Sequence, residues 1–87
     1  MVVKMTLKDR VFDVIADCLP DVLRSVEIDE NDRLDDLGLY YIDILDLATR
    51  LEDVFDQIVL TETEIDAWRT ARDVFESVER QMAERGM

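Results

Sequence analysis

Apolar side chains recur every three or four residues in three segments of this chain, which is the spacing of an amphipathic helix. The segments cover residues 7–19, 41–55 and 71–82. Only two glycines and one proline occur in 87 residues, which favours helices and argues against a sandwich of strands joined by tight turns. The sequence therefore predicts an all-α fold, and the absence of a linker or repeat predicts a single domain over residues 1–87.

Helix ends are marked by threonines that precede an acid by three residues, the pattern of a capping box. The pair at Thr61 predicts a short extra helix that includes Ile65 and Trp68. Pro20 disfavours helical geometry in Leu19, so the first helix is predicted to end near there. The three threonine–acid pairs are Thr6–Asp9, Thr61–Glu64 and Thr70–Asp73, and Gly86 is predicted to close the last helix.

Apolar residues predicted to be buried outside the first and last helices fall into three groups. A long polar connection, residues 25–39, has isolated apolar anchors, and a connection of that length is usually functional. Gly38 supplies the freedom to turn into the second helix. The anchors are Val26, Ile28, Leu34 and Leu37; the second helix offers Ile44, Leu47, Ala48, Leu51, Val54 and Phe55, broadened by Ile42 and Leu45; and Ile58, Val59 and Leu60 follow as plugs.

Residues 36–56 carry a family resemblance. They read Asp-Leu-Gly, one residue, two tyrosines and then an acidic amphipathic helix. This resembles the signature of acyl and peptidyl carrier proteins, which read Asp-Leu-Gly, one residue, Asp-Ser-Leu and then such a helix. The resemblance covers roughly residues 9–78 and is strongest over residues 34–56. It implies a four-helix bundle with three main helices, one short helix and a long first loop.

The attachment residue of the carrier family is missing. Tyr40 stands at the position of the Asp, and Tyr41 at that of the Ser, which in the family carries 4'-phosphopantetheine. The tyrosine hydroxyl lies a ring's length further from the backbone than a serine hydroxyl, and Ser25 and Ser77 lie elsewhere. We therefore expect no phosphopantetheine, although a carrier loaded by an unconventional attachment remains an alternative.

Two structural roles are open for the tyrosine pair. In the first, one ring packs inward over Leu37 and Ile42 while the other covers the helix end, or the rings plug a cavity that would accept an acyl chain. In the second, the rings are exposed within an acidic surface, which is how an interface hot spot is often built. Packing is expected for at least one ring.

Charge indicates the kind of partner. The chain has a net charge of −12, and residues 27–56 hold eleven acids against two arginines. Such a surface repels nucleic acid and anionic lipid headgroups and attracts a basic protein surface. The predicted function is docking to a basic patch on a carrier-dependent enzyme of acyl or lipid, polyketide or peptide biosynthesis. The predicted contact residues are Tyr40, Tyr41, Asp43, Asp46, Glu52 and Asp53.

Catalysis by this chain is not expected. It has no histidine, no glycine-rich phosphate cradle and a single cysteine, Cys18, on an apolar stripe that predicts burial. Residues 29–32 have the composition of a calcium loop, but Leu34 stands where its glycine is needed, so no metal site is expected. No apolar run is long enough to insert in a membrane, which predicts a cytoplasmic protein. An acidic inhibitor or antitoxin that covers a basic enzyme is a further alternative.

Overall fold

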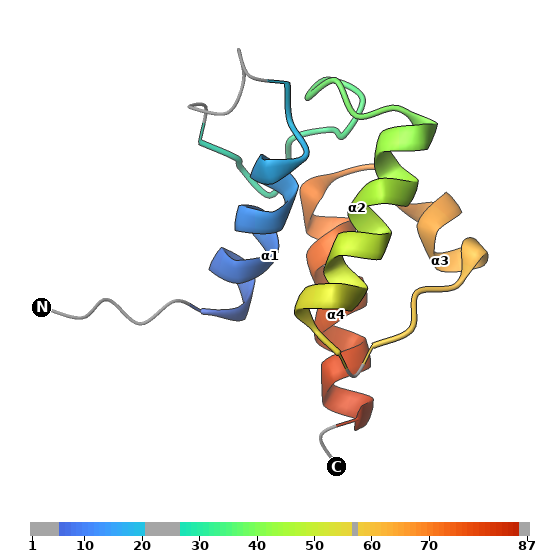
Figure 1. Ribbon diagram of the computed structural model, residues 1–87. Helices are drawn as coiled ribbons and strands as arrows, with labels where there is room; N and C mark the ends of the chain where they lie inside the picture. Colours follow the sequence, from blue (N-terminus) through green and yellow to red (C-terminus); the bar gives the residue numbers. More distant parts are fainter. Residues whose placement is uncertain (1–5, 21–26, 57, 86–87) are drawn as a thin grey trace, which may run out of the picture.

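The computed structural model describes residues 6–20, 27–56 and 58–85, and all regular secondary structure in these ranges is helical. Three long helices and one short one form in these ranges, as the sequence predicted, and Figure 1 shows how they are arranged. The predicted all-α bundle is therefore confirmed. The helices are α1 (Leu7–Asp17), α2 (Tyr41–Val54), α3 (Glu62–Ala67) and α4 (Ala71–Arg85). The predicted Val26 anchor and Gly86 cap lie outside the described residues.

The three helices for which a threonine–acid pair predicted a start begin at that pair. Thr6, Thr61 and Thr70 each accept a hydrogen bond from the amide three residues further on, at 3.1, 3.3 and 3.4 Å. The acid returns the bond at the starts of α1 and α4, which completes both capping boxes. It does not do so at α3, because Glu64 turns away and its Oε1 accepts from Nε2 of Gln81 in α4 at 3.0 Å.

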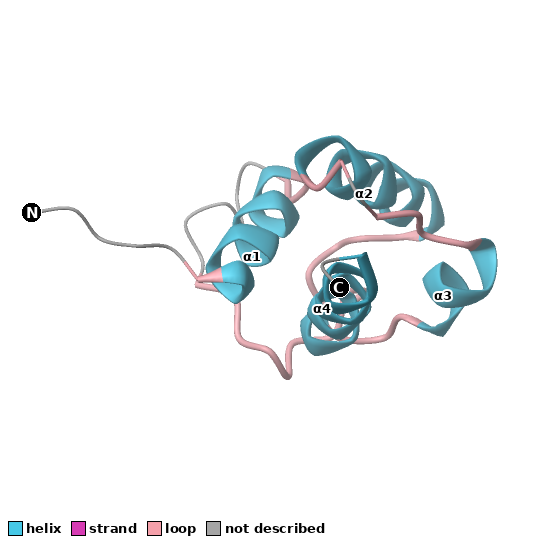
Figure 2. Cartoon of the chain, turned by 90° about the horizontal axis from the view of Figure 1, so that it is seen from below, coloured by secondary structure: helices cyan, strands magenta, loops and turns pink. Residues whose placement is uncertain are grey.

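The core forms around α4. Seen from below, α4 lies in the middle, with α1, α2 and α3 arranged around it (Figure 2). The predicted stripes point inward, and burying them supplies the main driving force for folding. The buried residues of the four helices and their ends are Val11, Val14, Ile15, Leu19, Leu47, Ala48, Leu51, Phe55, Ile65, Trp68, Ala71, Val74 and Val78.

Three apolar residues predicted to be buried are exposed instead. Ile42 is 79% exposed, Val54 45% and Val59 54%. Ile42 and Val54 lie in the first and last turns of α2, at the rim of the bundle, and Val59 lies between the buried plugs Ile58 and Leu60. The helical period correctly gave the direction of the stripe, but it carries no information about where the neighbouring helices stop.

The long connection is fixed to α4 through its backbone as well as its apolar anchors. Leu34 and Leu37 are buried and Ile28 is half-buried. The amide of Ala71 donates to a connection carbonyl at 3.0 Å and that of Arg72 to another at 2.9 Å. These bonds satisfy amides that a helix start leaves without partners. The accepting carbonyls belong to Asp32 and Glu30.

The Glu30 side chain joins the connection to two helices. One carboxylate oxygen accepts from Nζ of Lys8 in α1 at 2.8 Å, and the other pairs with Arg72 in α4. Hydrogen bonds from Lys8 and Arg72 lower the pKa of Glu30 to about 2. The connection between α1 and α2 is thus anchored to the outer helix and to the central one.

Candidate docking surface at the start of α2

The turn into α2 sets the direction of the side chains that follow it. Gly38 has a φ of +84°, in the left-handed region that favours glycine, as predicted. The buried Leu37 and Leu39 flank it, and the amide of Leu39 donates to the carbonyl of Leu34 at 2.9 Å. Both leucines point into the core, and the next side chain, that of Tyr40, lies at the surface.

Both tyrosines are exposed. Tyr40 is 67% and Tyr41 63% exposed, and with Ile42 they form three consecutive exposed apolar side chains. We call these three residues the tyrosine patch. The prediction that at least one ring packs inward over Leu37 and Ile42 is wrong, since the core at this end is already filled by Leu37 and Leu39 and Ile42 itself faces solvent.

A surface hollow of about 200 Å³ lies beside the tyrosine patch. The rings therefore rim a surface hollow and do not plug an interior cavity. Its lining is apolar with a charged edge. Arg33 is held there by Asp35, whose two carboxylate oxygens accept from the guanidinium at 3.1 and 3.0 Å. The remaining lining comes from Leu34, Leu39, Ile44, Trp68 and Arg69.

The predicted acidic docking residues of α2 have unequal roles. Asp43 accepts from the backbone amide of Tyr40 at 3.1 Å, so its carboxylate caps the helix. Asp46 pairs with Arg50 at 2.9 Å, one turn further on. Glu52 accepts from the amide of Leu60 at 2.8 Å and so ties α2 to the connection that follows it.

Asp46 and Asp53 are the exposed members of that predicted set. Asp43 and Glu52 are half-buried and each accepts a backbone hydrogen bond, so both carry a structural role that the sequence reasoning missed. The spacing of Tyr40 and Asp43 could have signalled the helix cap. Nothing local signals the bond between Glu52 and Leu60, because their separation matches no helical or turn pattern.

No serine stands at the start of α2. Tyr41 is the first residue of α2, where the family places its serine. Ser77 is 4% exposed in α4, and its hydroxyl accepts from the indole of Trp68 at 2.8 Å. Thr49, in the middle of α2, donates to the carbonyl of Leu45 at 3.1 Å. Ser25 lies outside the described residues.

Two further features singled out in the sequence are Cys18 and the acids of residues 29–32. Burial raises the pKa of the half-buried Cys18 thiol, against the smaller opposing effect of Arg50, and this disfavours the thiolate, which is the nucleophilic form. Asp29 and Asp32 accept backbone hydrogen bonds within their own turn, at 3.0 and 2.8 Å. Among the described residues no three side chains gather to hold a metal ion, and no helix there is long and apolar enough to cross a membrane.

The fold matches a known one. The structure superposes on the crystal structure of an acyl carrier protein from Thermotoga maritima with a TM-score of 0.75, over 94% of this chain and 98% of that one. The two sequences are 20% identical. No protein-family model matches the chain, and no curated protein matches its sequence. The chain therefore has the acyl-carrier-protein fold, as the resemblance in residues 36–56 implied.

Proposed function

We propose that this chain is a carrier-protein-like docking module that binds a carrier-dependent enzyme of acyl or lipid, polyketide or peptide biosynthesis and works without phosphopantetheine of its own. The exposed tyrosine patch carries this proposal, since it stands at the position where carrier proteins bear their serine. The carrier fold supports a carrier-type role, and the lack of an aliphatic hydroxyl at that position supports a role that needs no thiol arm.

Apolar anchors and long-range charge contribute differently to such binding. Tyrosine rings offer large contact areas at a low cost in side-chain entropy, so the patch is suited to supply affinity. Exposed ion pairs contribute about 0–1 kcal/mol each, so the acids contribute mainly to the rate of encounter with a basic partner. A net charge of −12 gives that attraction a long reach at low salt.

The patch is tested by binding to purified carrier-dependent enzymes from the source organism. The variant Tyr40→Ser/Tyr41→Ser should bind its enzyme at least about tenfold more weakly, as expected for the loss of central aromatic anchors. Val59→Ser is the control, because Val59 is 54% exposed and follows the far end of α2, a helix of 14 residues that is about 20 Å long. Equal binding by the tyrosine variant and the wild type would refute this docking surface.

The acidic face is tested by charge reversal at residues that hold no backbone bond. Asp46→Lys/Asp53→Lys should slow association and reduce its dependence on salt. Glu79→Lys/Glu84→Lys makes the same change in net charge on exposed positions of α4 and serves as control. If the two variants associate at the same rate, only overall charge matters and the α2 face has no special role.

A carrier with an unconventional attachment is the second candidate. Its support is that Tyr41, at the serine position, presents a hydroxyl on a side chain that is 63% exposed. The intact mass of the protein purified from its native source separates the two candidates. An added mass equal to the phosphopantetheine arm would refute the docking module without a prosthetic group; the unmodified chain mass supports it.

A further inference from the structure

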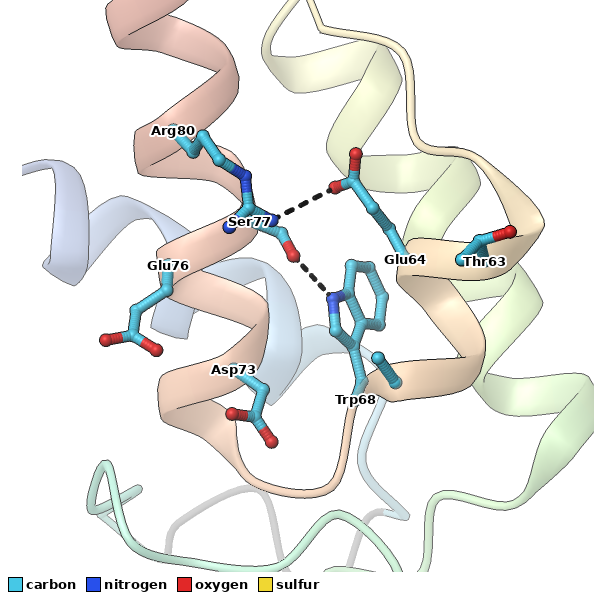
Figure 3. A pocket seen from close by; sticks show the side chains of 8 residues that line it. Thr63, Glu64, Trp68, Asp73, Glu76, Ser77 and Arg80 are labelled. Carbon is cyan, nitrogen blue, oxygen red and sulfur yellow. Dashed lines mark hydrogen bonds and ion pairs between the residues drawn. The ribbon is translucent and has the colours of Figure 1, made fainter.

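A second cavity, of about 310 Å³, opens between α3 and α4. Figure 3 shows Glu64 and Trp68 on the α3 side facing Ser77 and Arg80 of α4. This volume is at the lower end of small-molecule sites, so it suits a small ligand. Trp68 also lines the hollow beside the tyrosine patch, but the carboxylates of this cavity, from Glu64, Asp73 and Glu76, lie outside that hollow.

The carboxylate of Glu64 is only half satisfied. Its Oε1 accepts from Gln81 at 3.0 Å, whereas its Oε2 is buried and has no hydrogen-bond partner. It forms an ion pair with Nη2 of Arg80 at 3.7 Å (Figure 3), a distance longer than a hydrogen bond. A buried oxygen that accepts no hydrogen bond costs free energy. The distance between Oε2 and the guanidinium is long enough for a further donor to bind the oxygen.

The rest of the cavity is shaped by a fixed indole ring. Nε1 of Trp68 donates to Oγ of Ser77 at 2.8 Å, and both side chains are more than nine-tenths buried. The bond holds the ring in place as an apolar wall below Glu64 (Figure 3). Aliphatic groups and cations both bind favourably to the face of an indole ring.

We propose that this cavity binds a small organic cation: a primary ammonium group that donates to Oε2 of Glu64, joined to a short aliphatic chain that lies against Trp68. An ammonium group has three donors and no acceptor, which matches an oxygen that accepts no hydrogen bond. Three carboxylates against one arginine give the lining a negative charge. Arg80 is 57% exposed and can turn outward to solvent as the ammonium enters.

The probe for this test is n-butylammonium, titrated into the full chain at constant ionic strength. Trp68 is the only tryptophan, so its fluorescence and indole N–H resonance report on the cavity without labelling. We expect saturable changes with a dissociation constant in the millimolar range, because so small a ligand makes few contacts. Unlike the ammonium, n-butanol, which lacks the charge, should give no saturation over the same concentrations.

Variants decide which group holds the probe. Glu64→Gln should weaken binding at least about tenfold by removing a charge-assisted hydrogen bond. Glu62→Gln, an exposed position of α3 with the same change in charge, should bind as the wild type does. Thermal melts of each variant establish that it is folded before it is titrated.

Removing the competing cation, the guanidinium of Arg80, should have the opposite effect on binding. Arg80→Gln should tighten binding severalfold, since it removes a positive charge from the cavity. Weaker binding by Arg80→Gln, saturable binding of butyrate in place of n-butylammonium, or equal binding by Glu64→Gln and Glu62→Gln would each overturn the proposal. Partner binding should be unchanged in Glu64→Gln, so failure here does not touch the docking function.

Discussion

The starts of α2 and α4 both have an aspartate three residues after the cap position, but only α4 has a threonine at the cap itself. At α4, Thr70 and Asp73 exchange two hydrogen bonds, and Asp73 accepts a further one from the amide of Arg69 at 2.8 Å. The next amides, those of Ala71 and Arg72, donate to the long connection. The amides at the start of α4 are therefore satisfied by other parts of the chain, and their bonds attach the long connection to the helix.

At α2 the same exchange is incomplete. Asp43 accepts from the amide of Tyr40, but a tyrosine hydroxyl is too far from its own backbone to return the bond. Within the described ranges, nothing accepts from the amides of Tyr41 and Ile42, whose side chains face solvent. In this chain the start of α4 is therefore hydrogen-bonded to other segments, whereas the start of α2 is exposed to solvent.

The largest test of this contrast removes a buried residue of the long connection whose amide donates to the carbonyl of Arg69, just before α4. Leu34 is 3% exposed, and Leu34→Ala should lower the free energy of unfolding by about 2–5 kcal/mol through lost burial and a cavity. Ile42→Ala, at the exposed start of α2, should change the free energy of unfolding by no more than about 0.5 kcal/mol. Urea denaturation measures both. Similar losses in the two variants would contradict this contrast.

The two capping acids provide a smaller, more local comparison. Asp73→Ala removes two bonds to backbone amides and should cost about 1–3 kcal/mol of unfolding free energy, whereas Asp43→Ala removes one and should cost about 0.5–1.5 kcal/mol. Thermal unfolding of the two variants side by side measures the difference. The contrast fails if Asp43→Ala proves the more damaging of the two.

Much of the fold could be predicted because its signals are local. A threonine three residues before an acid, or an apolar residue every third or fourth position, depends only on near neighbours, and Thr6, Thr61 and Thr70 accordingly cap their helices. Gly38 is a similar case, since only a left-handed turn requires it there.

The candidate site was less predictable because it depends on contacts distant in sequence. Whether a tyrosine faces inward is decided by what already fills the core, here Leu37 and Leu39. The role of Glu52 depends on where the chain passes eight residues later, and its acidic character gave no hint of a bond to Leu60. The sequence thus predicted a candidate site at the start of α2, while the exposure and hydrogen bonds of its residues required the structure.

Low pH should weaken the attachment of the long connection to α1 and α4, because this attachment depends on the charge of Glu30. Because its pKa falls from 4.5 to about 2 on folding, its pairs with Lys8 and Arg72 stabilise the fold fully above pH 4.5, and that contribution is lost as the pH falls towards 2. Glu30→Gln should therefore melt below the wild type near neutral pH, and the gap should close as the pH approaches 2. Glu27→Gln, an exposed neighbour, is the control. A gap that is constant with pH would show that the charge of Glu30 contributes nothing.

The smallest expected effect is the most informative about the exposed start of α2. Tyr40→Ser/Tyr41→Ser should change the free energy of unfolding by no more than about 0.5 kcal/mol, since both side chains are more than three-fifths exposed. The same variant is the one expected to lose partner binding, so stability and binding would separate at this site. A loss of stability well above that value would show that the rings support the fold, and weaker partner binding could then no longer be assigned to direct contact.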